Sequence, residues 1–151
     1  MTGFGIAELA EGGGRLGLCP MPGAAGDYGR ELGSVLRWAP QMVVTMATAA
    51  ELHVVAGSLP ADLAHEGIAW RHLPVADFAH RSTALTLDWP RVSAEAHAIL
   101  AAGGRVLFHC RGGCGRSGMA VLRLMVEAGE APEAALARLR DVRPCAVETE
   151  A

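Results

Sequence analysis

One passage constrains the fold of this chain more than any other. A short apolar run, Val106–Phe108, leads into His109 and Cys110, and the six residues that follow, 111–116, include three glycines and two arginines. An apolar segment with helical spacing, 119–126, comes next. This pattern is typical of a buried strand that ends in a tight loop at the start of a helix, and it indicates an α/β fold.

The residues of this loop suit the binding of an anion. Glycines allow successive backbone N–H groups to point into one concavity, and the start of the following helix adds a positive field. The planar guanidinium of Arg116 matches two oxygens of a phosphate group. Cys110 would lie at the bottom of this concavity, where the same positive field stabilises a thiolate. The loop therefore predicts a nucleophile placed under a bound phosphate.

Strand-like and helix-like segments alternate along the rest of the chain. We predict one domain over 1–151, with a three-layer α/β/α fold and a central, mostly parallel sheet of four to five strands. The predicted strands are 4–9, 15–19, 41–46, 68–74 and 106–108. Helices are predicted over 27–38, 49–55, 61–65, 90–103, 116–126 and 132–140, with 75–87 as a long loop. Asp88, directly before Trp89 and Pro90, is expected to cap the fourth of these helices.

Composition and charge exclude several classes of function. The net charge is −3, which offers no basic surface for nucleic acid or anionic lipid. No targeting or membrane-spanning segment is recognised, so we expect a cytoplasmic protein. All 13 basic residues are arginines, which favours a GC-rich bacterial source.

The histidines lack metal-ligand spacing. The four cysteines match neither a zinc site nor a disulfide framework, so free thiols are expected.

The loop resembles the signature H-C-x5-R-[S/T] of the protein tyrosine phosphatases, with His109, Cys110, Arg116 and Ser117 at the defined positions. Three further segments resemble compact dual-specificity phosphatases of the cyclin-dependent-kinase-associated type. They are the opening Leu16–Gly23, the acid-loop segment Leu73–Asp77 and the late-helix segment Leu139–Pro144.

The resemblance implies a role for each site residue and requires no metal or organic cofactor. Cys110 attacks phosphorus, Ser117 assists departure of the cysteine sulfur, and His109 orients the loop. Asp77 is the implied general acid and later the base, with Asp88 as its rival. Relatives often carry a glutamine that positions the water, and Glu148 has the nearest comparable position. The implied substrate-binding residues are Arg111, Gly112, Gly113, Cys114, Gly115 and Arg116.

The implied substrates are phosphorylated proteins, carrying phosphotyrosine and also phosphoserine or phosphothreonine, and a phosphate or sulfate ion could occupy the loop. A phosphatase of phosphoinositides or other small phosphate esters is the second hypothesis. A non-catalytic phosphate-binding module and a thiol redox protein using Cys110 and Cys114 are the other two. In the redox hypothesis, Cys114 captures an oxidised Cys110 as a disulfide. Cys19 and Cys145 are interpreted as packing thiols.

Overall fold

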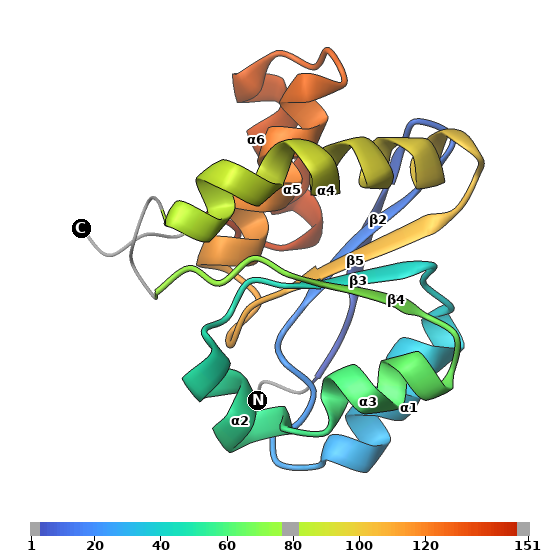
Figure 1. The fold of residues 1–151 in the computed structure, drawn as a ribbon. Coiled ribbons are helices and arrows are strands. Elements are labelled where there is room, and N and C mark those ends of the chain that lie inside the picture. The colour runs from blue at the N-terminus through green and yellow to red at the C-terminus, as the bar shows by residue number, and fades with distance from the viewer. Residues whose placement is uncertain (1–3, 77–81, 148–151) are drawn as a thin grey trace.

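The computed structural model describes residues 4–76 and 82–147 and contains a five-stranded sheet with the order β1-β2-β5-β3-β4 (Figure 1). The strands are β1 (Ala7–Glu11), β2 (Gly14–Cys19), β3 (Met42–Thr45), β4 (Ala69–His72) and β5 (Arg105–His109). The β1 strand is antiparallel to β2, and every other neighbouring pair is parallel. The predicted fold class, with a mostly parallel central sheet, is confirmed.

Helices cover both faces of the sheet (Figure 1). They are α1 (Tyr28–Trp38), α2 (Ala49–Ala56), α3 (Leu59–His65), α4 (Thr83–Ala101), α5 (Gly115–Glu127) and α6 (Pro132–Val142). The helices α1, α2 and α3 share one hydrophobic core with one face of the sheet, and α4, α5 and α6 share another with the opposite face. The middle strand β5 contributes to both cores: Val106 and Phe108 to the second, and Leu107 to the first. This burial on both faces explains its continuous apolar sequence.

The register of the three middle strands determines where the loop after β5 lies. His109, the last residue of β5, is paired with Cys19 at the end of β2 and with Thr45 at the end of β3. Cys110 therefore leaves the sheet at its carboxyl edge, between two neighbouring strands that end at the same level. This edge is where open α/β sheets place their ligand sites.

The prediction that Asp88 caps a helix was wrong. The α4 helix begins at Thr83, where the hydroxyl of Ser82 accepts a hydrogen bond of 2.9 Å from the N–H of Leu85. Asp88 and Pro90 both lie inside the helix. Leu85 packs against the core beside the buried Trp89, so packing extends the helix by more than one turn ahead of the proline. Tertiary contact thus outweighed the local preference of proline for a first turn.

Within residues 4–76 and 82–147, no helix combines the length and the apolar character needed to cross a membrane.

Candidate active site

Cys110 is 2% exposed and follows β5 directly, at the floor of the glycine-rich loop. Its sulfur lies 3.4 Å from the hydroxyl oxygen of Ser117, which is fully buried in the first turn of α5. The hydroxyl can therefore donate a hydrogen bond to a sulfur that carries negative charge. The strand and the helix hold the two side chains together, because the six residues between them form the loop and the start of α5.

His109 is fully buried, and burial lowers its pKa to about 4. The ring is therefore neutral at pH 7. Its Nδ1 lies 3.0 Å from the carbonyl oxygen of Cys110, which can only accept, so Nδ1 carries the proton. The Nε2 atom then accepts from the Thr45 hydroxyl at 2.6 Å, and Thr45 accepts from Trp70 Nε1 at 2.8 Å. This chain of hydrogen bonds fixes the orientation of the Cys110 carbonyl.

Arg116 is also buried, and its charge is balanced by a residue far away in the sequence. Nη1 and Nη2 donate to the two carboxylate oxygens of Glu51 at 2.6 and 2.9 Å, in the bidentate geometry that a guanidinium favours. Nη1 also donates to the carbonyl oxygen of Val75 at 2.8 Å. Arg116 thus connects α5 to the start of α2 and to the segment that follows β4.

A capping box holds Glu51 in place. The Thr48 hydroxyl accepts from the N–H of Glu51, and the Glu51 carboxylate accepts from the N–H of Thr48 at 2.9 Å. The hydrogen bonds from Arg116 contribute most to lowering the pKa of Glu51, which falls to about 2. The carboxylate is therefore fully charged at neutral pH.

Replacing Glu51 with glutamine is expected to lower the free energy of unfolding by about 3 kcal/mol at pH 7, because it removes a negative charge that lies in direct contact with the buried guanidinium of Arg116. The stabilisation depends on pH, since the native pKa of Glu51 is about 2 and its ordinary value is 4.5. The contribution is complete above the ordinary value and is lost as the pH falls towards 2. Urea unfolding of both proteins from pH 7 to pH 3 checks this, and a stability difference that grows in acid would contradict it.

The backbone of the loop is tightly constrained and contains a run of N–H groups beside the start of α5. Gly113 has a φ of +74°, and a Cβ atom there would collide with the backbone of Cys19 and Pro20, so glycine is required. The carbonyl of Arg111 accepts from the N–H of Met21 at 3.0 Å, which ties the loop to the segment after β2. The N–H groups of residues 111–115 donate to no group in the part of the chain that the structure describes. Such an arrangement of donors beside a helix start is suited to an anion.

Comparison with solved structures agrees with this geometry. The crystal structure of kinase-associated phosphatase with a serine in place of its catalytic cysteine has a TM-score of 0.81 and 25% identity, covering 99% of this chain and 89% of that one. A glycine-to-alanine mutant form of Tk-PTP has a TM-score of 0.71 and 30% identity, covering 89% of this chain and 81% of that one. This chain belongs to the cysteine-dependent tyrosine and dual-specificity phosphatase superfamily.

Another member of the phosphatase superfamily shares the fold at lower identity. PTPMT1, in complex with PI(5)P, has a TM-score of 0.70 and 21% identity, covering 87% of this chain and 80% of that one. No protein-family model and no curated protein sequence matches the chain. The structures at 25% identity and above support phosphatase activity, whereas the PTPMT1 likeness concerns the fold alone.

The structure brings several of the predicted phosphatase residues together: Cys110, Ser117 and His109 are in direct contact or adjacent, and Arg116 lies in the first turn of the same helix as Ser117. Arg111 is exposed at the start of the loop. Two predicted residues, Asp77 and Glu148, lie outside the described residues. Among the residues that the structure describes, no cluster of three or more His, Cys, Asp or Glu side chains could hold a metal ion.

The cysteines are paired differently from the expectation. Cys114 forms a disulfide with Cys145, so Cys114 is not placed to capture Cys110, and Cys145 is not a packing thiol. Cys19 and Cys110 are free and buried. Burial raises the pKa of Cys19, which keeps that thiol protonated at neutral pH. The sequence could not reveal the disulfide, because its two cysteines are 31 positions apart and their spacing matches no known framework.

Three residues that were not predicted from the sequence contact the signature segment, 109–117: Glu51, Thr45 and Arg143. A signal existed for Glu51, because Thr48 and Glu51 have the T-x-x-E spacing of a capping box directly after a predicted strand. Its partnership with Arg116 had no such signal, since it depends on how α2 and α5 pack in three dimensions.

Proposed function

We propose that this protein is a metal-independent phosphatase that hydrolyses phosphotyrosine in proteins, and also phosphoserine and phosphothreonine, through a phosphocysteine intermediate. The observation that carries the proposal is the arrangement of the loop. The sulfur of Cys110 lies 3.4 Å from the Ser117 hydroxyl, at the start of a loop whose N–H groups donate to no group that the structure describes. An anion bound by these donors would be held directly in front of the sulfur.

In the proposed first step, the sulfur of Cys110 forms a bond to phosphorus while the bond from phosphorus to the leaving oxygen breaks. Arg116 and the N–H groups of the loop stabilise the negative charge on the equatorial oxygens. By resemblance to the family, Asp77 gives its proton to the leaving oxygen. His109 is neutral and buried, so it orients the loop and does not donate a proton to the substrate.

In the proposed second step, water attacks the phosphocysteine, and Asp77 accepts a proton from that water. The bond from sulfur to phosphorus breaks, phosphate leaves, and the Cys110 thiolate returns. The hydrogen bond from Ser117 stabilises the sulfur as its negative charge develops, which makes it a better leaving group. No step requires a metal ion.

Protein substrates are favoured over phosphoinositides by the charge around the loop. Arg111 is the only basic residue between Cys110 and Arg116, whereas a polyanionic headgroup calls for several positive side chains. Arg143 also lies beside the loop, but its guanidinium is engaged by loop carbonyl oxygens.

The test compares hydrolysis of an aryl phosphate by the native chain, with its Cys114–Cys145 disulfide intact, with and without a chelator. Reactions quenched in acid are analysed by mass spectrometry for a phosphate on the peptide that contains Cys110. Chelator-insensitive turnover with phosphocysteine is expected, as is faster hydrolysis of a phosphotyrosyl peptide than of a short-chain phosphoinositide. Turnover that requires a metal, or a folded native chain without turnover, would overturn the proposal. Binding of phosphate without turnover would favour a binding module.

A further inference from the structure

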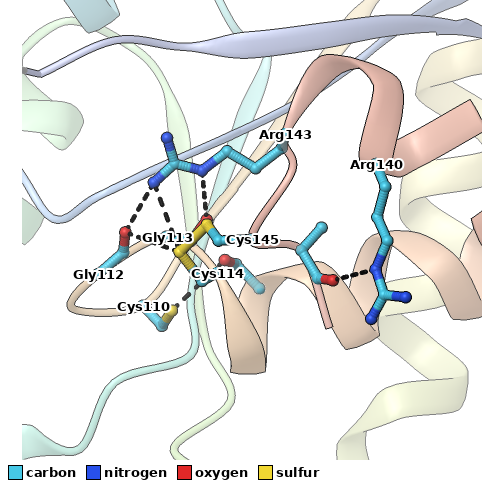
Figure 2. Close-up of a disulfide and its surroundings, with 9 residues drawn as sticks. Cys110, Gly112, Gly113, Cys114, Arg140, Arg143 and Cys145 are labelled. Atoms are coloured by element: carbon cyan, nitrogen blue, oxygen red, sulfur yellow. Dashed lines mark hydrogen bonds between the residues drawn. A yellow bond between two sulfur atoms is a disulfide. The ribbon is translucent and has the colours of Figure 1, made fainter. Parts of the chain in front are cut away.

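The turn after α6, residues 143–147, lies against the outer side of the signature loop (Figure 2). Arg143 donates from Nη2 to the carbonyl oxygen of Gly112 at 2.9 Å and from Nε to that of Gly113 at 3.0 Å. The N–H of Val147 donates to the carbonyl oxygen of Cys114 at 3.0 Å. The disulfide between Cys114 and Cys145 joins the same two segments covalently. These links connect this turn, which we call the C-terminal turn, to three consecutive loop residues.

These contacts determine where the loop N–H groups point. In a planar trans peptide, the carbonyl of one residue and the N–H of the next point in opposite directions, and the described chain has no cis peptide. A carbonyl held outward by the C-terminal turn therefore directs the following N–H inward. Arg143 orients the N–H groups of Gly113 and Cys114 in this way, and Val147 orients that of Gly115. These are three of the proposed phosphate-binding donors.

The C-terminal turn is itself firmly attached. The N–H of Arg143 donates to the carbonyl of Leu139 at 2.9 Å. The guanidinium of Arg140 donates to the carbonyl of Ala146 at 2.9 Å (Figure 2). Ala146 is fully buried, and a Cβ atom at Gly118 would be 2.6 Å from the Val147 nitrogen, so the turn packs closely on α5. The turn can therefore transmit the position of α6 to the loop.

We propose that Arg143 and the Cys114–Cys145 disulfide are positioning elements of the phosphate-binding loop, and that reduction of this disulfide weakens phosphate binding. This inference rests on the proposed function. In the oxidised protein, the covalent bond holds the C-terminal turn against the loop, and Arg143 remains aligned with the two glycine carbonyls. A reduced chain keeps only the hydrogen bonds, and the flexible glycine loop reaches conformations in which its N–H groups no longer converge.

The redox step is an ordinary thiol–disulfide exchange. A thiolate of a dithiol reductant attacks one sulfur of the disulfide, which breaks the S–S bond, releases the other cysteine as a thiol and leaves a mixed disulfide. The second thiol of the reductant then attacks the mixed disulfide and releases the remaining cysteine. Cys114 and Cys145 gain two electrons and two protons and become thiols, while the reductant becomes a disulfide. Cys110 takes no part in this exchange.

The first experiment measures binding of inorganic phosphate by calorimetry in the Cys110→Ser background, so that the reductant cannot act through the nucleophile. Reduction is expected to weaken phosphate binding about tenfold, which corresponds to about 1.4 kcal/mol. Adding Cys114→Ser and Cys145→Ser should give the weaker affinity under all conditions, with no response to reductant. An equal affinity of the oxidised, reduced and double-serine proteins would overturn the inference.

The second experiment tests Arg143 by kinetics with an aryl phosphate. Arg143→Met is expected to raise KM about tenfold, and Arg143→Lys should restore little of the loss, because lysine cannot bridge two carbonyls as a guanidinium does. The control is Arg138→Met, in the preceding helix α6, where the side chain binds Glu11 and Glu130 away from the loop. Equal effects of the Arg138 and Arg143 variants would show a general loss of stability and contradict a positioning role.

The two proposals fail in different ways. A native chain that hydrolyses the aryl phosphate, with a phosphate affinity insensitive to reductant and to Arg143→Met, leaves the proposed function intact and removes the inference. A folded native chain without turnover, whose phosphate affinity still falls on reduction, removes the catalytic function and supports the inference.

Discussion

Cys110→Ser is expected to reduce hydrolysis of an aryl phosphate by at least about 10⁴-fold, the scale on which enzymes lose rate when a covalent nucleophile is removed. The replacement leaves the loop N–H groups, Arg116 and Ser117 in place, since serine is close in size to the buried cysteine. Binding of inorganic phosphate should therefore survive. The physical reason is that a serine hydroxyl is a much weaker nucleophile than a cysteine sulfur at neutral pH.

The matched control for this prediction is Cys19→Ser, at the other free and buried cysteine. Burial raises the pKa of Cys19, so its thiol remains protonated and cannot serve as the nucleophile. Steady-state kinetics with the two variants, after their folding is verified by circular dichroism, check the assignment. Substantial turnover by Cys110→Ser, or loss of phosphocysteine in Cys19→Ser alone, would show that Cys110 is not the nucleophile.

Gly113→Ala should lower kcat/KM by about 10²-fold or more, the loss observed when one donor to a transition-state oxyanion is removed. Gly113 has a left-handed φ of +74°, which costs about 1–2 kcal/mol for any residue with a Cβ. The added methyl group would also collide with the backbone of Cys19 and Pro20, which cannot retreat because β2 continues into this segment. The loop would have to move, and its N–H groups would no longer converge.

Gly112→Ala adds the same methyl group one residue earlier and is the comparison for this effect. A Cβ at Gly112 meets no atom within 4 Å, and its φ is not left-handed. The loss of kcat/KM should accordingly be much smaller than for Gly113→Ala, when both are measured with one aryl phosphate. Equal losses in the two variants would contradict the argument from backbone geometry and point to a general sensitivity of the loop to side chains.

Much of the fold followed from local patterns. The apolar run before Cys110 indicated a fully buried strand, and β5 is the middle strand of the sheet. Asp27 was expected to begin a helix, and its carboxylate accepts from the N–H of Arg30 at the start of α1. These features depend on residues within one or two turns of each other, which is the range over which periodicity and capping act. The start of α4 at Thr83 was not predicted, because the packing of Leu85 against the core determines where this helix begins.

The sequence by itself determined the chemical content of the candidate site: a cysteine, glycines and an arginine between a strand and a helix, all within nine residues of one segment, 109–117. Tertiary structure decided which residues support that segment. Glu51 balances Arg116, Thr45 orients His109, and Cys145 is bonded to Cys114. Each partner comes from another element, and its contact depends on strand order and on how helices pack over the sheet. Local sequence patterns carry no information about those distances, so only the folded chain reveals them.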